Sequence, residues 1–190
     1  MGISGTVIKG GNCDTVVKEV LKSAKELESP ELGKVKTEFI TLADKEIAMC
    51  KHCQWCIENR APCQYKDDAQ IIYEKIAKCD GLILGTPTWF NTISPPFPIL
   101  FSRARTLVFF SHEFRNKVVG LVTVGFLGFG LEHCIDSLKS MMAAGHMLPV
   151  MEAEVRASAV AFGQRAEYLE HGAIDDSGGI SRADRMGASP

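Results

Sequence analysis

The sequence predicts an α/β protein with a doubly wound parallel sheet. Short apolar runs of strand length alternate with segments whose apolar residues recur at helical spacing, which is the pattern of consecutive βαβ units. Glycine-rich or aromatic loops follow several of the predicted strands, where such sheets bind their ligands. A compact group of four cysteines follows the second predicted strand. With 190 residues, the chain fits a single domain, residues 1–190, with an insertion at about 48–66.

The first half of the chain begins with a short apolar stretch over residues 1–4. Residues 15–28 then place valines and leucines on one face of a helix. Residues 35–42 alternate between apolar and polar side chains as a strand does. Asp67 and Asp68 predict the N-terminal cap of the next helix.

The second half continues the alternation. Residues 81–87 form a continuous apolar run between glycines, which indicates a strand buried on both faces. We expect residues 88–95 to form a loop. The remaining predicted elements are strands at 117–124 and 147–153, helices at about 96–110 and 131–142, and a short helix after Asp175.

The composition argues against several classes of function. Lys and Arg number 21 against 23 Asp and Glu, so the formal net charge is −2 and no basic surface for nucleic acid is indicated. The longest apolar stretches are far shorter than the ~18–20 residues of a membrane-spanning helix, and no signal-peptide pattern opens the chain. We therefore expect no nucleic-acid or membrane partner and a cytoplasmic location.

The first candidate site is the glycine-rich segment ahead of the first helix. Free backbone N–H groups and the positive end of the helix dipole favour a phosphate group there. The segment matches neither the dinucleotide-binding pattern nor the P-loop pattern, so dinucleotides and nucleoside triphosphates are not favoured. A βα turn that uses glycine only for its shape is the alternative. The side chains expected to complete a phosphate site are Ser4, Thr6, Lys9, Asn12 and Thr15.

Two further loops contain aromatic residues that can cover a planar ring. The first sets two aromatics among small polar residues, and its alternative role is to close the core. The second, residues 125–130, is rich in glycine, so its backbone can approach a ring closely. Together with a monophosphate site, these loops favour FMN over NAD. The expected ring-binding residues are Pro87, Thr88, Trp89, Phe90, Asn91, Thr92 and Gly125.

The most specific pattern in the chain is a four-cysteine segment with two, two and six intervening residues. Thiolates at such spacings are typical ligands of a 4Fe–4S cluster, whereas a structural zinc site usually takes cysteine pairs from two separated knuckles. Zinc, redox-active thiols and the absence of any metal are the alternatives. The remaining cysteines, Cys13, Cys79 and Cys134, are expected to be small buried hydrophobes. The expected cluster ligands are Cys50, Cys53, Cys56 and Cys63.

Taken together, these segments resemble the iron–sulfur flavoprotein family, within the NADPH-dependent FMN reductase group of flavodoxin-like proteins. The resemblance is carried by ISGT with KGGNCDT, by CKHCQWCIENRAPC, by GLILGTPTWFNTIS and by VVGLVTVGFLGFG. It implies a five-stranded flavodoxin-like sheet, FMN and a 4Fe–4S cluster in each subunit. It also implies a ferredoxin-like electron donor and a homodimer or dimer of dimers. The chain departs from the family at Val7 and Ile8, where a proline and an arginine are usual.

Electron transfer is the function that these features predict, and no catalytic acid or base is required for it. The cysteine segment follows an edge strand, so it lies at least one strand spacing, about 5 Å, from the flavin site. We therefore expect the cluster to face the flavin of a neighbouring subunit and dimerisation to be required for turnover. An NAD(P)H-dependent FMN or quinone reductase with structural or sensory cysteines is the alternative. A redox or metal sensor without FMN is a third hypothesis.

Overall fold

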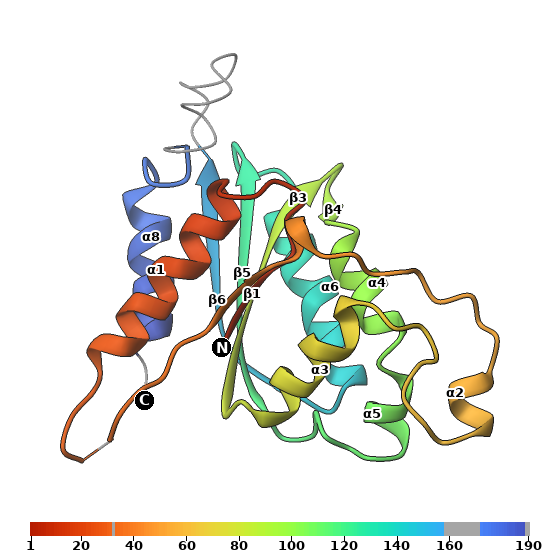
Figure 1. Cartoon of the computed structure of the whole chain (residues 1–190). Coiled ribbons are helices and arrows are strands. Elements are labelled where there is room, and N and C mark those ends of the chain that lie inside the picture. Colours follow the sequence, from red (N-terminus) through yellow and green to blue (C-terminus); the bar gives the residue numbers. More distant parts are fainter. Residues whose placement is uncertain (32, 158–171, 189–190) are drawn as a thin grey trace.

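The computed structural model describes residues 1–31, 33–157 and 172–188 and shows a sheet between two layers of helices (Figure 1). The elements are β1 (Gly2–Ser4), α1 (Asn12–Glu26), β2 (Phe39–Thr41), the 3₁₀ turn η1 (Leu42–Asp44), α2 (Trp55–Glu58), α3 (Asp68–Lys78), β3 (Gly81–Trp89), β4 (Thr92–Ile93), α4 (Pro96–Ser102), α5 (Arg105–Phe109), β5 (Val118–Phe126), α6 (Leu131–Ala144), β6 (Leu148–Ala157) and α8 (Ser177–Gly187).

The sheet has the strand order β2-β1-β3-β5-β6, and all neighbours in this order are parallel. The short strand β4 pairs antiparallel with the end of β3. This arrangement confirms the predicted flavodoxin-like sheet with five parallel strands. The chain leaves β1 toward β2 on one side and continues to β3 on the other, so the order reverses between β1 and β3. Ligands of doubly wound sheets bind beside such a reversal.

Two apolar cores lie on the two faces of the sheet. Helices α1 and α8 pack against each other and cover one face, where Val20 and Met186 meet Val122 and Val155 of the central strands (Figure 1). On the other face, α3, α4 and α6 cover a larger core around Leu84. No helix in the described ranges has the length and apolarity that crossing a membrane requires.

Strand β2 is shorter than the sequence predicts, three residues in place of the strand expected over 35–42. Its register explains the difference: Phe39 pairs with Gly2 and Thr41 pairs with Ser4. Because β1 itself has only three residues, it offers no further backbone groups for β2 to bind. The alternating pattern over 35–38 therefore belongs to extended chain outside the sheet.

The segment expected as a loop over 88–95 is in part a tight β-hairpin. Thr88 pairs with Ile93 and Trp89 with Thr92, so β3 extends two residues beyond the predicted end. The backbones of Phe90 and Asn91 take the left-handed conformation, which two-residue hairpin turns require. The periodicity of the surrounding apolar residues carries no information on this turn.

The helix expected over residues 96–110 is interrupted after Ser102. The N–H of Arg103 donates to the Leu100 carbonyl at 3.2 Å, and the N–H of Ala104 donates to the Phe101 carbonyl at 3.1 Å. These bonds span three residues rather than four, so they tighten the last turn of α4 and change the direction of the chain. Helix α5 begins at Arg105 as a separate short element. The other predicted helices and strands are present with ends shifted by a few residues.

Helix α1 approaches the sheet closely because Gly85 lies beneath it. A Cβ atom at Gly85 would overlap with the Val17 side chain, and it would lie 3.4 Å from the Cys13 sulfur. Both Val17 and Cys13 are buried on the inner face of α1. The glycine at the centre of β3 therefore sets the distance between α1 and the sheet, and with it the position of the segment that precedes α1.

Gly85→Ala is expected to lower the free energy of unfolding by about 1–3 kcal/mol, because the new methyl group overlaps with Val17. Adding Val17→Ala should recover part of this loss, although Val17→Ala alone creates a cavity and destabilises the protein. Denaturant unfolding of the wild type, both single variants and the double variant measures the coupling. Purely additive losses would show that this contact does not set the position of α1.

Candidate functional site

Three loops meet at the carboxyl edge of the sheet. They follow β1, β3 and β5, which are direct neighbours, so residues 5–11, 90–91 and 127–130 lie side by side at the upper edge in Figure 1. The sequence predicts parallel strands, which place the loops that follow them at one edge of the sheet. The observed strand order confirms this prediction. We refer to these three loops as the rim.

The first rim loop is a tight turn held by its own hydrogen bonds. The N–H of Ile8 donates to the Thr6 hydroxyl at 3.0 Å, and the N–H of Gly10 donates to the Asp14 carboxylate at 2.7 Å. The first N–H groups of α1 precede any bond within the helix and leave the positive end of its dipole at this loop. The hydroxyl of Ser4 is buried and has no hydrogen-bond partner among the described residues. The donors that remain for an anion are the first N–H groups of α1 and the Ser4 hydroxyl, next to the buried Asp14 carboxylate.

The structure places the other three predicted phosphate ligands in different roles. The Lys9 ammonium forms an ion pair with Asp44 at 2.8 Å, beside η1. The Asn12 side-chain oxygen accepts a hydrogen bond from the N–H of Ala173 at 2.8 Å. The hydroxyl of Thr15 donates to the Gly11 carbonyl at 3.2 Å. These three side chains fix the shape of the loop. The remaining candidates for binding a phosphate are the backbone N–H groups, Ser4 and Thr6.

The hairpin between β3 and β4 presents its aromatic side chains to solvent. Trp89 is 43% exposed and Phe90 is fully exposed, so the alternative that they close the core does not hold. Thr86 braces the hairpin from below, since its hydroxyl accepts a hydrogen bond from the N–H of Ser94 at 3.1 Å. A rigid turn with uncovered aromatic side chains is suited to contact a planar ring.

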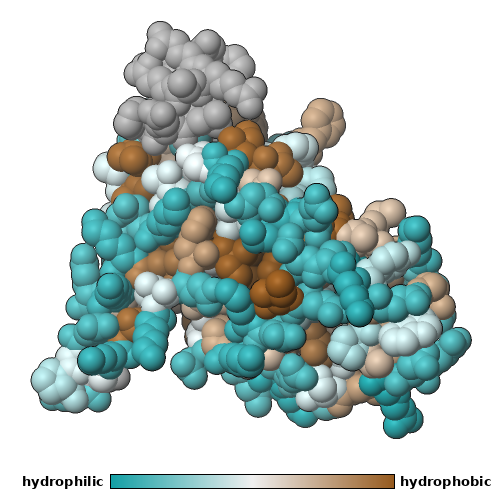
Figure 2. Space-filling view, in the orientation of Figure 1, coloured by the Kyte–Doolittle hydropathy of each residue, from teal (hydrophilic) through white to brown (hydrophobic). Residues whose placement is uncertain are grey.

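The glycines of the third rim loop allow it to pack directly against the hairpin. A Cβ atom at Gly125 would lie 2.8 Å from the Thr88 hydroxyl, and one at Gly130 would lie 2.6 Å from the Cα atom of Asn91. The loop also exposes Phe129, which is 64% accessible to solvent. Figure 2 shows apolar surface along this upper edge. The sequence predicts that this loop approaches a bound ring closely. In the structure, the close contact that its glycines allow is with the hairpin.

The four-cysteine segment lies apart from the rim. After η1 the chain runs outward from the edge strand β2, forms the short helix α2 beside α5, and returns to α3 (Figure 1). All seven cysteines are free thiols, and Cys53 is exposed while the other three of the segment are half-buried. The four predicted ligands line one pocket, together with Arg103 and Arg105. We refer to it as the cysteine pocket.

Local backbone geometry curves the segment around this pocket. His52, Gln54 and Arg60 all have left-handed backbones, which are uncommon outside glycine. The N–H of His52 donates to the Cys50 sulfur at 3.4 Å, and the side-chain amide of Gln64 donates to the Cys53 sulfur, also at 3.4 Å. Donors that point at sulfur stabilise thiolate ligands and tune the cluster that they hold.

The donor set fits a cluster better than a single ion. Among the described residues, no three His, Cys, Asp or Glu side chains converge closely enough to hold one metal ion. In a 4Fe–4S cluster each thiolate binds a different iron, so the ligands surround a larger body and stand farther apart than those of zinc. Four free thiols that line one pocket, two of them with donors to their sulfurs, are the type of donor set that such a cluster uses.

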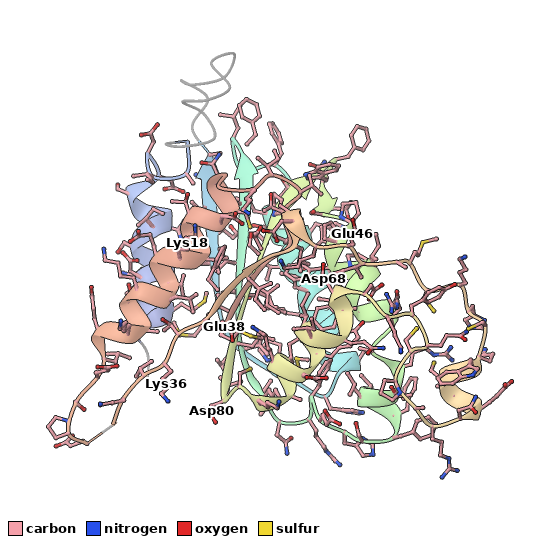
Figure 3. All side chains as sticks on the ribbon, in the orientation of Figure 1. Lys18, Lys36, Glu38, Glu46, Asp68 and Asp80 are labelled. Atoms are coloured by element: carbon pink, nitrogen blue, oxygen red, sulfur yellow. The ribbon has the colours of Figure 1, made fainter. Side chains whose placement is uncertain are left out.

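Hydrogen bonds attach both ends of the cysteine segment to α3. The Asp68 carboxylate accepts from the N–H of Glu46 at 2.8 Å, and the N–H of Asp68 donates to the Glu46 carbonyl at 3.2 Å (Figure 3). Asp67, the N-terminal cap of α3, accepts from the N–H groups of Ala48 and Ala69. The amide of Gln70 donates to the Cys63 carbonyl at 2.7 Å. The prediction that Asp67 caps this helix is confirmed, and the same carboxylate also binds the segment.

The sequence reasoning did not identify Arg103, whose buried side chain forms an ion pair with Asp67 in the wall of the cysteine pocket. The available signal is an arginine two residues after the apolar run PFPILF, because a charge at the end of such a segment requires a buried partner. Periodicity alone does not show which carboxylate supplies it.

Two of the three scattered cysteines, Cys13 and Cys134, are buried as the sequence predicts, whereas Cys79 is only half-buried. Burial raises the pKa of the Cys13 thiol to about 12 and that of the Cys134 thiol to about 11, so both stay protonated near neutral pH. Burial also raises the pKa of the half-buried Cys79 thiol. These three thiols are therefore poor nucleophiles and poor metal ligands.

The sheet order and the rim define the class of flavodoxin-like flavoproteins. Within it, the chain belongs to the NADPH-dependent FMN reductase family, whose sequence model matches residues 1–161. Two solved structures illustrate the shared fold. A flavone reductase superimposes with a TM-score of 0.69 at 20% identity, covering 98% of this chain and 59% of that one. A Trp repressor binding protein from Bacillus subtilis gives 0.63 at 18% identity, covering 97% and 95%.

Relatives by sequence include iron–sulfur flavoproteins. One from Methanocaldococcus jannaschii is 38% identical over 125 residues, which are 66% of this chain and 61% of that protein. One from Methanosarcina thermophila is 31% identical over 150 residues, 78% of this chain and 75% of that protein. An NAD(P)H-dependent FAD/FMN reductase from Geobacillus thermodenitrificans is 28% identical over 125 residues, 66% of this chain and 58% of that protein. The matched segment thus spans less than two thirds of the first of these relatives.

Gly130→Ala is expected to weaken flavin binding and to destabilise the protein more than a change at a free glycine. The backbone of Gly130 has a φ of 74°, and its new Cβ would meet Asn91, so the hairpin must move. Gly33→Ala is the matched control, because Gly33 has a φ of 77° and nothing within 4 Å. The control should lose about 1–2 kcal/mol in the free energy of unfolding and keep its flavin affinity. Equal effects of the two changes on flavin affinity would contradict the proposed contact between rim loops.

Proposed function

We propose that the protein is an electron-transfer iron–sulfur flavoprotein that passes electrons between a ferredoxin-type donor, a 4Fe–4S cluster and FMN to a further acceptor. The observation that carries this proposal is the cysteine pocket: four free thiols line it, and the sulfurs of Cys50 and Cys53 accept hydrogen bonds. Membership of a flavin reductase family and similarity to iron–sulfur flavoproteins support it.

FMN is the flavin proposed to bind at the rim, as the family implies. In this proposal the Thr6 loop and the first N–H groups of α1 hold the phosphate. The hairpin residues Trp89 to Asn91 and the loop after Gly125 contact the ring. Neither a second phosphate site nor a general acid or base is needed for this role, since a flavin supplies one- and two-electron chemistry itself.

The cysteine pocket is placed for exchange with other molecules. Cys53 is exposed and the segment lies outside the sheet, so an external electron donor can approach it. The rim and the cysteine pocket lie on different sides of the chain, which supports transfer from a cluster to the flavin of a neighbouring subunit. We therefore propose a homodimer or dimer of dimers as the working form. Free thiols also suit the reducing cytoplasm.

An NAD(P)H-dependent FMN or quinone reductase is the second candidate. The family match and the similarity to the FAD/FMN reductase favour it. In that case the cysteines are structural or sensory, and purified protein is yellow and free of iron. Iron and sulfide content, together with the visible spectrum of anaerobically purified protein, distinguishes the two candidates.

Cys53→Ala is expected to abolish cluster binding while leaving FMN in place. Wild-type protein should contain about four irons per chain, and the variant close to none, because one corner of the cluster loses its thiolate. Cys79→Ala is the control, since Cys79 lies outside the cysteine pocket. It should keep iron and FMN at wild-type levels. Iron analysis and flavin fluorescence after release measure both, and loss of FMN along with iron in Cys53→Ala would mean that the segment supports the fold.

Thr6→Ala is expected to lower the affinity for FMN by about tenfold or more, because a phosphate loses the loop that the Thr6 hydroxyl shapes. Riboflavin lacks the phosphate, so it should bind the wild type much more weakly and should respond little to the substitution. Titration of apoprotein with FMN and with riboflavin, followed by quenching of flavin fluorescence, gives the four affinities. A similar loss for both flavins would place the phosphate elsewhere.

A further inference from the structure

Arg103 is the most buried charged side chain beside the cysteine pocket. It follows the last residue of α4, its side chain is 0% exposed, and it lines the pocket with the four cysteines. A buried guanidinium is costly unless each of its N–H groups has an acceptor. The acceptors of Arg103 therefore show what this residue is for.

Three hydrogen-bond acceptors and one aromatic ring surround the guanidinium, and all of them belong to the two ends of the cysteine segment. One terminal nitrogen, Nη1, donates to the Ala48 carbonyl at 3.0 Å and forms the ion pair with Asp67. The other, Nη2, donates to the Tyr65 carbonyl at 3.1 Å, and the Tyr65 ring lies 5.4 Å from the guanidinium carbon. Ala48 precedes the first cluster cysteine and Tyr65 follows the last. Arg103 thus joins the chain on both sides of the cysteines.

The remaining nitrogen, Nε, has no hydrogen-bond partner among the described residues although it is buried. Such a donor is rare in folded proteins and requires an explanation. Arg103 and the predicted ligand Cys63 line the same pocket, so the guanidinium and a ligand sulfur border a common space.

We propose that Arg103 is a positioning residue for the cluster, and that its free Nε–H donates to a sulfur of the bound cluster. This inference rests on the proposed function. The inference assigns two separate roles to Arg103. Its contacts to Ala48 and Tyr65 hold the cysteine segment in place, and its positive charge and Nε–H donor act on the cluster. A reduced cluster has one more negative charge than an oxidised one, so Arg103 raises the reduction potential.

Three variants test the two roles in anaerobically purified protein. Arg103→Gln removes the charge and most of the donors, whereas Arg103→Lys keeps the charge but loses the planar fork. Arg105→Gln is the matched control, because Arg105 lines the same pocket, is half-exposed and makes no hydrogen bond in the described part of the chain. Iron and sulfide per chain, FMN content and circular dichroism are measured first. The cluster potential is then measured by redox titration with electron paramagnetic resonance.

We expect Arg103→Gln to have a more negative cluster potential than the wild type and to lose iron several times faster during exposure to a chelator. Arg103→Lys should keep a potential near that of the wild type but should also lose iron faster. Arg105→Gln should change neither quantity much. If Arg103→Gln cannot assemble a cluster, Arg103→Lys takes its place in the test. The rate of iron loss and the cluster potential of Arg103→Lys are then compared with those of Arg105→Gln.

Two results would overturn the inference. The first is a wild-type potential and wild-type iron retention in Arg103→Gln or, where that variant holds no cluster, wild-type iron retention in Arg103→Lys. The second is joint loss of FMN, iron and secondary structure in both Arg103 variants, which would make Arg103 a residue of the general fold. Wild-type protein without iron would instead refute the proposed function, and this outcome is read before any variant is compared.

Discussion

The pairing of β1 with two neighbours is the constraint on which the remaining structure depends. Three residues bind β2 on one side and β3 on the other, so their register fixes how these two strands lie relative to each other. On the β3 side this places the rim loops at one edge beside the start of α1. On the β2 side it limits the edge strand to three residues and sets the point where the chain leaves toward the cysteines. The two candidate cofactor sites thus have a common origin in one short strand.

Much of this architecture could be predicted from patterns that repeat along the chain. The buried strands β3 and β5 are continuous apolar runs, and the loops after them are recognisable by glycine and aromatic residues. The short β2, the hairpin at Phe90 and the break at Arg103 could not be predicted in this way. Each depends on a partner distant in sequence or on a local backbone angle, and periodicity encodes neither.

In the candidate sites too, some features could be predicted from the sequence and others are visible only in the folded chain. The cysteine spacing indicates the ligands because that chemistry requires neighbouring thiolates. The phosphate loop was predicted as a segment, yet Lys9 and Asn12 are occupied by Asp44 and by the Ala173 N–H, contacts that only the folded chain reveals. Helix α4 connects the two regions, since it begins just after the hairpin and ends at the buried Arg103. Any shift of this helix therefore changes both regions together.

The three left-handed backbones in the cysteine segment have a consequence for the lifetime of the protein. His52, Gln54 and Arg60 each hold a conformation that costs about 1–2 kcal/mol for a residue with a side chain. Without iron, only the stem contacts and a few donors to sulfur oppose relaxation of this stretch. Exposed chain that relaxes in this way is a preferred site of proteolytic cleavage. If the protein holds the proposed cluster, loss of that cluster would therefore leave this segment more open to proteolysis than in the loaded protein.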